Sequence, residues 1–530
     1  MGSGNSRMGM RRWARWSAAL VGAALSACNM TPEYERPTQE VGVNYRNAVP
    51  EPSPDMPRPL SRWWSSFGSD ELDVLIEEAL ENNHDIKAAT QRIAQAEAQA
   101  GSTASALLPS VSLTAKRSVD SPNGGQGTIV TPPTNKAHRL SAAGISASYE
   151  FDLWGKVRAS TESSLASALA NVHDRETIAI TLVADLTNTY MQYLEGVDRE
   201  RVARNNISNM RAMHAAVKER VRLGESSELE LAQQRNILAQ AEATVPPIVL
   251  QRERAFNKIA VLLGRAPDTL ALNGKTLFEM KLPNVSPGLP ADLLLRRPDV
   301  KKAEANLMAA NANIGIARAK MFPTLSLTGE RGWASQLADN FISPTSIYYT
   351  VASSLAATIF DNGKTQADID YSLAKKAELV ETYQQSILAA LRDVEDALVG
   401  IRMQADLETA QLEVNSASLV AYNLSSEAFR LGMVDYLNVL ETQRTRFQAE
   451  DAKVQARYGR FEALIGLYKA LGGGMEHEDE APPASAAAAP APAAVSTPSP
   501  APVAATPQPA PAGASVTMTP EITAVAAAAD

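Results

Sequence analysis

The residue types that usually carry enzyme chemistry are present in this 530-residue sequence, but they are scattered. No two histidines have the His-x-x-x-His spacing of a zinc site, and none lies in a carboxylate cluster with metal-ligand spacing. Gly124–Gly127 lacks the Lys-Ser/Thr of a phosphate-binding loop, and no Gly-x-Ser-x-Gly nucleophile elbow occurs. The sequence therefore predicts no enzyme, no metal and no other cofactor. The five histidines are His84, His138, His173, His214 and His477.

One nucleophile stands out by its position, the single cysteine Cys28. It is preceded by the basic residues Arg11, Arg12 and Arg15 and by the apolar stretch Trp16–Leu25, which predict a signal peptide over residues 1–27. Leu25–Cys28 resembles the bacterial lipobox, which implies covalent lipid such as palmitate on the cysteine, and Asn29 implies sorting to the outer membrane. Two or more acyl chains anchor a protein stably. The alternative is an ordinary signal peptide with an incidental cysteine.

The acidic balance of the chain argues against nucleic acid as a partner. The net charge is −9, whereas nucleic-acid binding requires a basic face. No run of about 18 apolar residues exists, so we expect no membrane-spanning helix in the mature chain. A membrane role would then depend on a lipid or on a β-barrel.

Between its ends the chain contains two copies of one plan. Three motifs recur in the same order with offsets of about 210 residues, far more than the roughly 20–50 residues of a solenoid unit. We infer a duplication, with one repeat at 69–289 and the other at 290–475. The pairs are Ala106–Leu113 with Lys320–Leu327, Phe151–Lys156 with Phe360–Lys364, and Arg222–Gly224 with Arg430–Gly432.

Each repeat begins with a predicted helix, over 69–105 and 290–321, followed by two predicted strands. In Ile145–Leu153 apolar residues alternate with Ser, Glu and Asp, which indicates a strand with one apolar and one polar face. Pro109–Ala115 and Pro323–Thr328 alternate in the same way. The chain should therefore hold four strands.

A very long helix is predicted after each pair of strands. Residues 156–223 and 364–431 each span 68 positions without proline and with one glycine. Such a helix would reach about 100 Å and suggests coiled-coil packing. A glycine turn and a return helix follow, with N-cap candidates at Ser227 and Asp435. We interpret the carboxylates of these helices as a solvated face.

The two ends of the chain differ from this body. Residues 31–60 are rich in proline, and we predict that they run extended along the folded surface. They belong to a predicted extended N-terminal segment with the lipid anchor, residues 28–68. Residues 476–530 form an Ala/Pro-rich tract. Because such a tract buries too little apolar surface to fold, we predict that it is disordered.

Four strands cannot close a transmembrane barrel alone, because outer-membrane barrels start at about eight strands. An open edge in lipid would leave backbone groups unpaired. If the strands span a bilayer, the chain must form a dimer, trimer or tetramer. A four-stranded sheet that caps a soluble helical bundle is the alternative.

The duplicated plan, the two Arg-Leu-Gly turns and the ending Leu467–Gly474 resemble the TolC-like outer-membrane efflux family. With its lipobox, the sequence resembles the lipoprotein branch of that family, which serves resistance–nodulation–division pumps. The resemblance covers residues 28–475. It implies a mainly α fold with a β-barrel part, in which a homotrimer shares a twelve-stranded barrel in the outer membrane and extends a periplasmic barrel of long helices. The implied partners are a periplasmic adaptor protein, an inner-membrane transporter of that pump class and outer-membrane lipid.

The resemblance also implies docking and gating residues in the helical part. The two turns match the tips where the adaptor docks, although a plain helix C-cap would look the same. Leu437, Glu441 and Arg444, with Arg430, match a periplasmic gate. Glu441 stands where Asp is usual, and an exposed ion pair on one helix is the alternative. The first repeat has Leu229, Gln233 and Asn236 there, so we expect the gate in the second repeat. The docking residues are Leu223, Gly224, Glu225, Leu431, Gly432 and Met433.

These features predict a lipid-anchored outer-membrane channel of a tripartite efflux pump. It would be a passive exit duct for drugs or other toxic small molecules, and the inner-membrane pump would supply the energy. Two alternatives stay open: the outer duct of a type I protein-secretion system, and a periplasmic coiled-coil lipoprotein that is not a channel.

Overall fold

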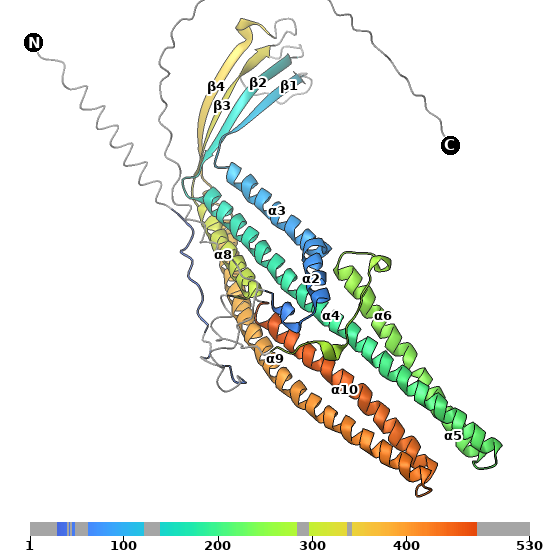
Figure 1. The fold of residues 1–530 in the computed structure, drawn as a ribbon. Helices are drawn as coiled ribbons and strands as arrows, with labels where there is room; N and C mark the ends of the chain where they lie inside the picture. The colour runs from blue at the N-terminus through green and yellow to red at the C-terminus, as the bar shows by residue number, and fades with distance from the viewer. Residues whose placement is uncertain are drawn as a thin grey trace, which may run out of the picture. The chain divides into compact units, whose positions relative to one another are not determined.

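The computed structural model describes residues 29–39, 42, 45–47, 62–120, 138–283, 296–335 and 342–473. The predicted signal peptide, the predicted lipidation residue Cys28 and the predicted disordered tail lie outside the described residues. Figure 1 shows four strands side by side and long helices arranged in antiparallel pairs. Among the described residues, no helix is both long and apolar enough to cross a membrane.

The first repeat has short helices, two strands and one very long helix with a return partner. Its elements are the 3-10 helix η1 (Trp63–Phe67), α2 (Asp70–Asn82), α3 (His84–Ser105), β1 (Ser110–Asp120), β2 (His138–Phe151), α4 (Lys156–Arg222), α5 (Glu228–Ala243) and α6 (Val245–Leu262).

The second repeat has the same order after a linker. The linker holds η2 (Pro267–Thr269) and η3 (Leu277–Glu279). Then come α8 (Pro298–Ala319), β3 (Thr324–Ser335), η5 (Pro344–Ser346), β4 (Ile347–Ala356), α9 (Lys364–Arg430) and α10 (Tyr436–Ala470).

The long helices α4 and α9 confirm the sequence prediction to within one residue, and each has 67 residues. The repeated Phe-Asp motif explains how each begins. Asp152 and Asp361 accept hydrogen bonds from helix N-terminal amides, at 3.0 Å from Val157 N and 2.9 Å from Thr365 N. The glycine that precedes each helix has a positive φ of 75° or 82°, which glycine adopts at little cost. The motif therefore forms the corner at which the chain leaves a strand and begins a capped helix.

Three of the predicted helices have different limits. The helix predicted over 69–105 is two helices, because Asn83 leaves the helical conformation (φ −58°, ψ 132°) and its side chain caps α3 through Asp85 N at 2.8 Å. The helix predicted over 290–321 begins at Pro298 within the described residues, where proline suits a first helical position. The first return helix is interrupted at Thr244, before a Pro-Pro pair at the start of α6. The second, α10, is continuous.

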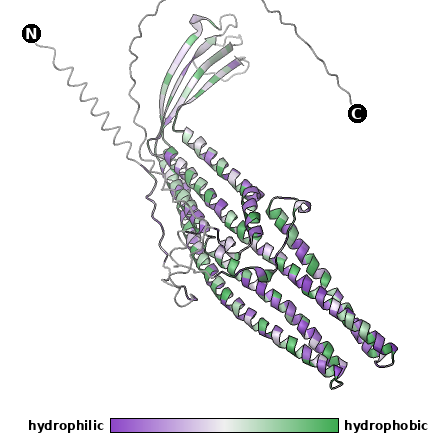
Figure 2. Ribbon diagram, in the orientation of Figure 1, coloured by the Kyte–Doolittle hydropathy of each residue, from purple (hydrophilic) through white to green (hydrophobic). Residues whose placement is uncertain are grey.

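The four strands form one antiparallel sheet in the order β1-β2-β3-β4. The pair β2–β3 joins the two repeats, with Ile145 opposite Arg331. Figure 2 shows hydrophilic and hydrophobic residues mixed along each strand. On one face the register aligns Val111, Leu113 and Ile145 with Trp333, Ile347, Tyr349 and Val351. The other face is polar, with Ser112 Oγ 2.7 Å from Ser146 Oγ. The prediction of four strands with one apolar and one polar face is confirmed.

An aromatic cluster connects the start of the folded body to its last helix. Trp63 of η1 stacks on Tyr468 of α10 with ring centroids 4.4 Å apart. Phe67 meets Phe461 edge to face at 5.7 Å. The rings belong to the largest buried cluster of the described residues, so the ends of the body are tied together by aromatic burial.

The described N-terminal residues run along α8. The Arg36 guanidinium binds Glu304 with two hydrogen bonds of 2.6 and 2.8 Å, a bidentate geometry that is strong for an ion pair. Asn311 Nδ2 donates to the Pro32 carbonyl at 2.7 Å. A Cβ atom on Gly315 would clash with Thr31. Gly315 therefore allows the N-terminal segment to lie close against α8. We call residues 29–36 the N-terminal strap.

Candidate functional site

The two glycine turns have the same backbone geometry. After α4, Gly224 N donates to Val221 O at 3.0 Å and Glu225 N to Arg220 O at 2.8 Å. After α9, Gly432 N and Met433 N make the corresponding bonds at 3.0 and 2.9 Å. These bonds define a Schellman ending. The glycines have φ of 78° and 71°, and open space surrounds the position of an added Cβ. Glycine is thus required here for its conformation.

Both turns present apolar side chains to solvent. Leu223 and Leu431 are more than half exposed, and Met433 is 74% exposed. A single exposed apolar residue is ordinary, but the same position is exposed in both repeats. The predicted docking residues therefore lie together at two tips of matching geometry, and docking itself stays a prediction.

The predicted gate residues share one exposed face of α10. Leu437 is 53% exposed, and Arg444 donates to Glu441 Oε1 at 2.9 Å. Both charged side chains are more than half exposed, where a single pair contributes little to stability. In the first repeat Leu229 is also exposed, but the matching Gln233 and Asn236 carry no charge. The two repeats therefore differ in charge on the exposed face of their return helices.

Arg430 is the last residue of α9, whereas the other three residues belong to α10. Its guanidinium pairs with Glu427 of the same helix, with Nε at 3.0 Å from Oε2. The hydrogen bond from Arg430 lowers the pKa of the Glu427 carboxyl. Arg222 pairs with Glu219 in the same way in the first repeat. Because the pair is duplicated, it belongs to the turn in both repeats, and its assignment to the gate rests on the family resemblance alone.

A buried contact that the sequence did not predict joins the two hairpins near their tips. The Tyr436 hydroxyl of α10 donates to Gln234 Oε1 of α5 at 2.6 Å, and Gln234 Nε2 donates to Met210 O of α4 at 3.1 Å. Gln234 is fully buried. Arg220 lies over the Phe429 ring at 5.4 Å. The second repeat is thus bonded to the first beside the predicted gate, through residues about 200 positions apart in the chain.

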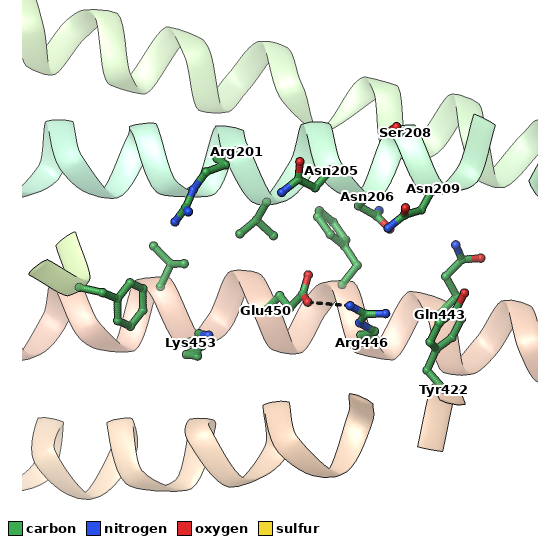
Figure 3. A pocket seen from close by; sticks show the side chains of 14 residues that line it. Arg201, Asn205, Asn206, Ser208, Asn209, Tyr422, Gln443, Arg446, Glu450 and Lys453 are labelled. Carbon is green, nitrogen blue, oxygen red and sulfur yellow. Dashed lines mark hydrogen bonds and ion pairs between the residues drawn. The ribbon is translucent and has the colours of Figure 1, made fainter. Parts of the chain in front are cut away.

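Next to this contact, on the side away from the tips, a polar cavity of about 480 Å³ lies between α4 and α10. Figure 3 shows asparagines of α4 and charged residues of α10 that point toward one another. Arg446 bridges to Glu450 at 3.3 Å and lies 5.1 Å from the ring centroid of Tyr422. Gln443 is buried, and its Oε1 has no hydrogen-bond partner within the described structure. At this level the two hairpins are therefore separated by a cavity with a polar lining.

The interpretation of the helix carboxylates as a solvated face is wrong for several of them. Asp198 is fully buried and accepts from Leu277 N at 2.9 Å and from Arg201 at 2.8 Å. Burial raises the pKa of its carboxyl. Glu408 is buried and binds Arg457 and Arg460 at 3.1 and 2.6 Å. These carboxylates hold helices together and attach the linker. Across the described residues no three metal-binding side chains gather into a possible metal site.

A family model described as "Outer membrane efflux protein" matches this chain in two segments, residues 75–265 and 289–473. The first segment lies within the predicted repeat 69–289, and the second begins one residue before the predicted repeat 290–475.

Similar proteins of known role cover most of this chain. It is 38% identical over 424 residues to the pyoverdine export outer membrane protein OpmQ of Pseudomonas aeruginosa, covering 79% of this chain and 88% of that protein. It is 28% identical over 460 residues to the cation efflux system protein CusC of Escherichia coli, covering 86% and 98%. The solved structure of the outer-membrane channel OprN matches with a TM-score of 0.77 and 28% identity, covering 84% of this chain and all of that one.

Proposed function

We propose, from the premise that this chain belongs to the outer membrane efflux protein family, that it is the exit duct of a tripartite pump for drugs or other toxic small molecules. Its family consists of channels, and the chain is an outer-membrane efflux channel rather than an enzyme. The observation that carries the proposal is the duplicated architecture, in which two strand pairs are continued by helices of about 100 Å.

A homotrimer is the assembly that we propose for the duct. Within the described chain β1 and β4 each pair on one side only, and an open edge is not tolerated in lipid. Three chains would supply twelve strands and close a barrel by joining β4 of one protomer to β1 of the next. The polar face of the sheet would then line the lumen and the apolar face would meet lipid.

The proposed lipid anchor fits the path of the N-terminal strap. Asn29, which follows Cys28, lies beside Gly155, where an added Cβ would be 3.2 Å from Asn29 Oδ1. Gly155 is the corner between β2 and α4. Acyl chains on Cys28 would therefore enter the membrane close to the periplasmic rim of the sheet. Replacing Cys28 with Ala should abolish labelling by a tagged fatty acid, and continued labelling would exclude the lipid.

We propose that the two tips dock a periplasmic adaptor, and that an inner-membrane transporter of the resistance–nodulation–division class delivers the substrate. Glu441 and Arg444 would close the duct where three protomers meet, because opposite charges can then alternate around the axis. The exposed apolar residues of the tips and the charge asymmetry between the repeats support these roles.

Pyoverdine, or a compound similar to it, is a second candidate cargo. The identity with a pyoverdine exporter is 38%, against 28% with a cation efflux protein. Loss of the gene should then lower the pyoverdine content of the medium, whereas for a drug pump it should lower drug tolerance.

Channel formation is tested on the purified full-length protein. We expect a heat-resistant trimer in detergent and single-channel conductance in planar bilayers. A monomeric product without conductance would exclude the channel and favour a structural lipoprotein.

A further inference from the structure

We propose that Arg331, on the apolar face of the sheet, binds the phosphate of an outer-leaflet glycolipid whose acyl chain lies in the depression around it. The proposal rests on the proposed function only in one respect, namely that this face meets membrane lipid.

Arg331 is a cation among apolar residues. The register places it in one row with Leu113, Ile145 and Tyr349. Because side chains alternate along a strand, Trp333 lies on the same face. The strand β3 is paired on both sides within the chain. The neighbours of Arg331 in the sheet are therefore set by this chain alone.

No carboxylate of the described structure forms an ion pair with Arg331. The adjacent Glu330 belongs to the opposite face, where its Oε1 accepts the Tyr348 hydroxyl at 2.5 Å. An arginine without a partner on a lipid face is costly in the hydrocarbon and almost free at an interface. The guanidinium of Arg331 is thus free to bind an anion from the surroundings.

The depth of Arg331 places it at the interface of the outer leaflet. The helices adjoin one end of every strand, so the periplasm lies on that side and the other end faces out. Arg331 is four residues before the outer end of β3, or roughly 13 Å along the strand. Trp333 and Tyr349 beside it are the residue types of an aromatic girdle. Its long side chain can therefore reach the headgroup level.

The surface around Arg331 is hollowed. A depression of about 670 Å³ includes Arg331 in its lining, together with the small residues Ala143, Ala147 and Gly329. Leu113, Ile145 and Val351 supply its apolar side. The combination suits one end of a phosphorylated lipid, with an acyl chain against the small residues and the phosphate on the guanidinium, which binds phosphate with two parallel hydrogen bonds.

The test is a lipid titration of the purified full-length protein followed by native mass spectrometry. Bisphosphorylated lipid A is the probe, and dephosphorylated lipid A is the comparison. We expect Arg331→Gln to bind the phosphorylated form about tenfold more weakly. Arg331→Lys should lose less affinity, because it keeps the charge. Arg331→Leu, which suits a lipid face, should assemble normally and bind as weakly as Arg331→Gln.

Arg117 provides the matched control, because it is an arginine on the same face, four rows nearer the outer end and outside the depression. Arg117→Gln should change the affinity less than twofold. Equal binding by Arg331→Gln and wild type, equal weakening by Arg117→Gln, or equal affinity for the dephosphorylated lipid would overturn the proposal. Displacement of the lipid by excess inorganic phosphate would assign the site to free phosphate instead.

Conductance measurements test the channel proposal independently of lipid binding. Arg331 faces away from the polar side of the sheet, so both Arg331→Gln and Arg331→Leu should conduct as wild type in planar bilayers. A wild-type protein that does not conduct but discriminates the two lipids would refute the duct and leave the lipid site in place.

Discussion

Replacing Tyr436 with Phe should loosen the contact between the two hairpins near their tips. The change deletes one hydroxyl and leaves the ring, which packs against Phe429 with centroids 5.4 Å apart. The buried Gln234 Oε1 then loses the donor at 2.6 Å. Leaving a buried acceptor without a partner costs about 1–3 kcal/mol. Burial raises the pKa of the Tyr436 hydroxyl above its usual value, so the hydroxyl donates throughout the neutral pH range.

Hydrogen-exchange mass spectrometry of the purified protein measures this cost directly. If amides at the start of α10 exchange through local opening, a loss of about 1–3 kcal/mol makes their exchange about 5- to 150-fold faster. Tyr422→Phe is the control, because the Tyr422 hydroxyl makes no hydrogen bond within the described structure although its ring contacts Arg446. Unchanged exchange in Tyr436→Phe, or an equal increase in Tyr422→Phe, would refute the reasoning.

Three further perturbations test the tips, the gate and the N-terminal strap. Gly432→Trp should leave trimer assembly intact, because the strands lie about 100 Å away along the helix, but should reduce adaptor cross-linking; unchanged cross-linking would remove this turn from the interface. Glu441→Ala leaves Arg444 without its partner at 2.9 Å and should raise single-channel conductance, whereas Gln233→Ala should not; identical conductance would leave the pair as a surface feature. Gly315→Ala forces a Cβ into the strap and should speed hydrogen exchange of the backbone amides of the strap, whereas Gly466→Ala meets open space and should leave it unchanged; equal exchange in the two variants would show that the strap is not seated there.

The long helices and the strands could be predicted because their signals are local. Absence of proline defines α4 and α9, and a period of two defines the two-faced strands. The sequence gives no sign of the break in the first helix, because Asn83 is neither proline nor glycine and acts by capping. The repeat predicts a fourth strand without giving its position, and the structure places it at Ile347–Ala356.

Contacts between distant helices could not be predicted from the sequence. Asp198 and Glu408 occur among other charges at helical spacing, and only the position of neighbouring helices makes them buried. Tyr436 and Gln234 are 202 positions apart. The tip and gate residues came from the family resemblance, which identifies positions but not partners.

The pairing of β2 with β3 has a consequence for symmetry. Each repeat supplies one strand pair and one long helical hairpin, so a trimer of this chain would contain six such units. Six separate half-length chains would make a ring with sixfold symmetry. Fusion of two units allows neighbours to diverge, and they have: the return helix is interrupted only in the first repeat, and the charges of Glu441 and Arg444 occur only in the second. The duplication therefore lets alternate hairpins of one ring acquire different mechanical properties, which six identical subunits could not encode.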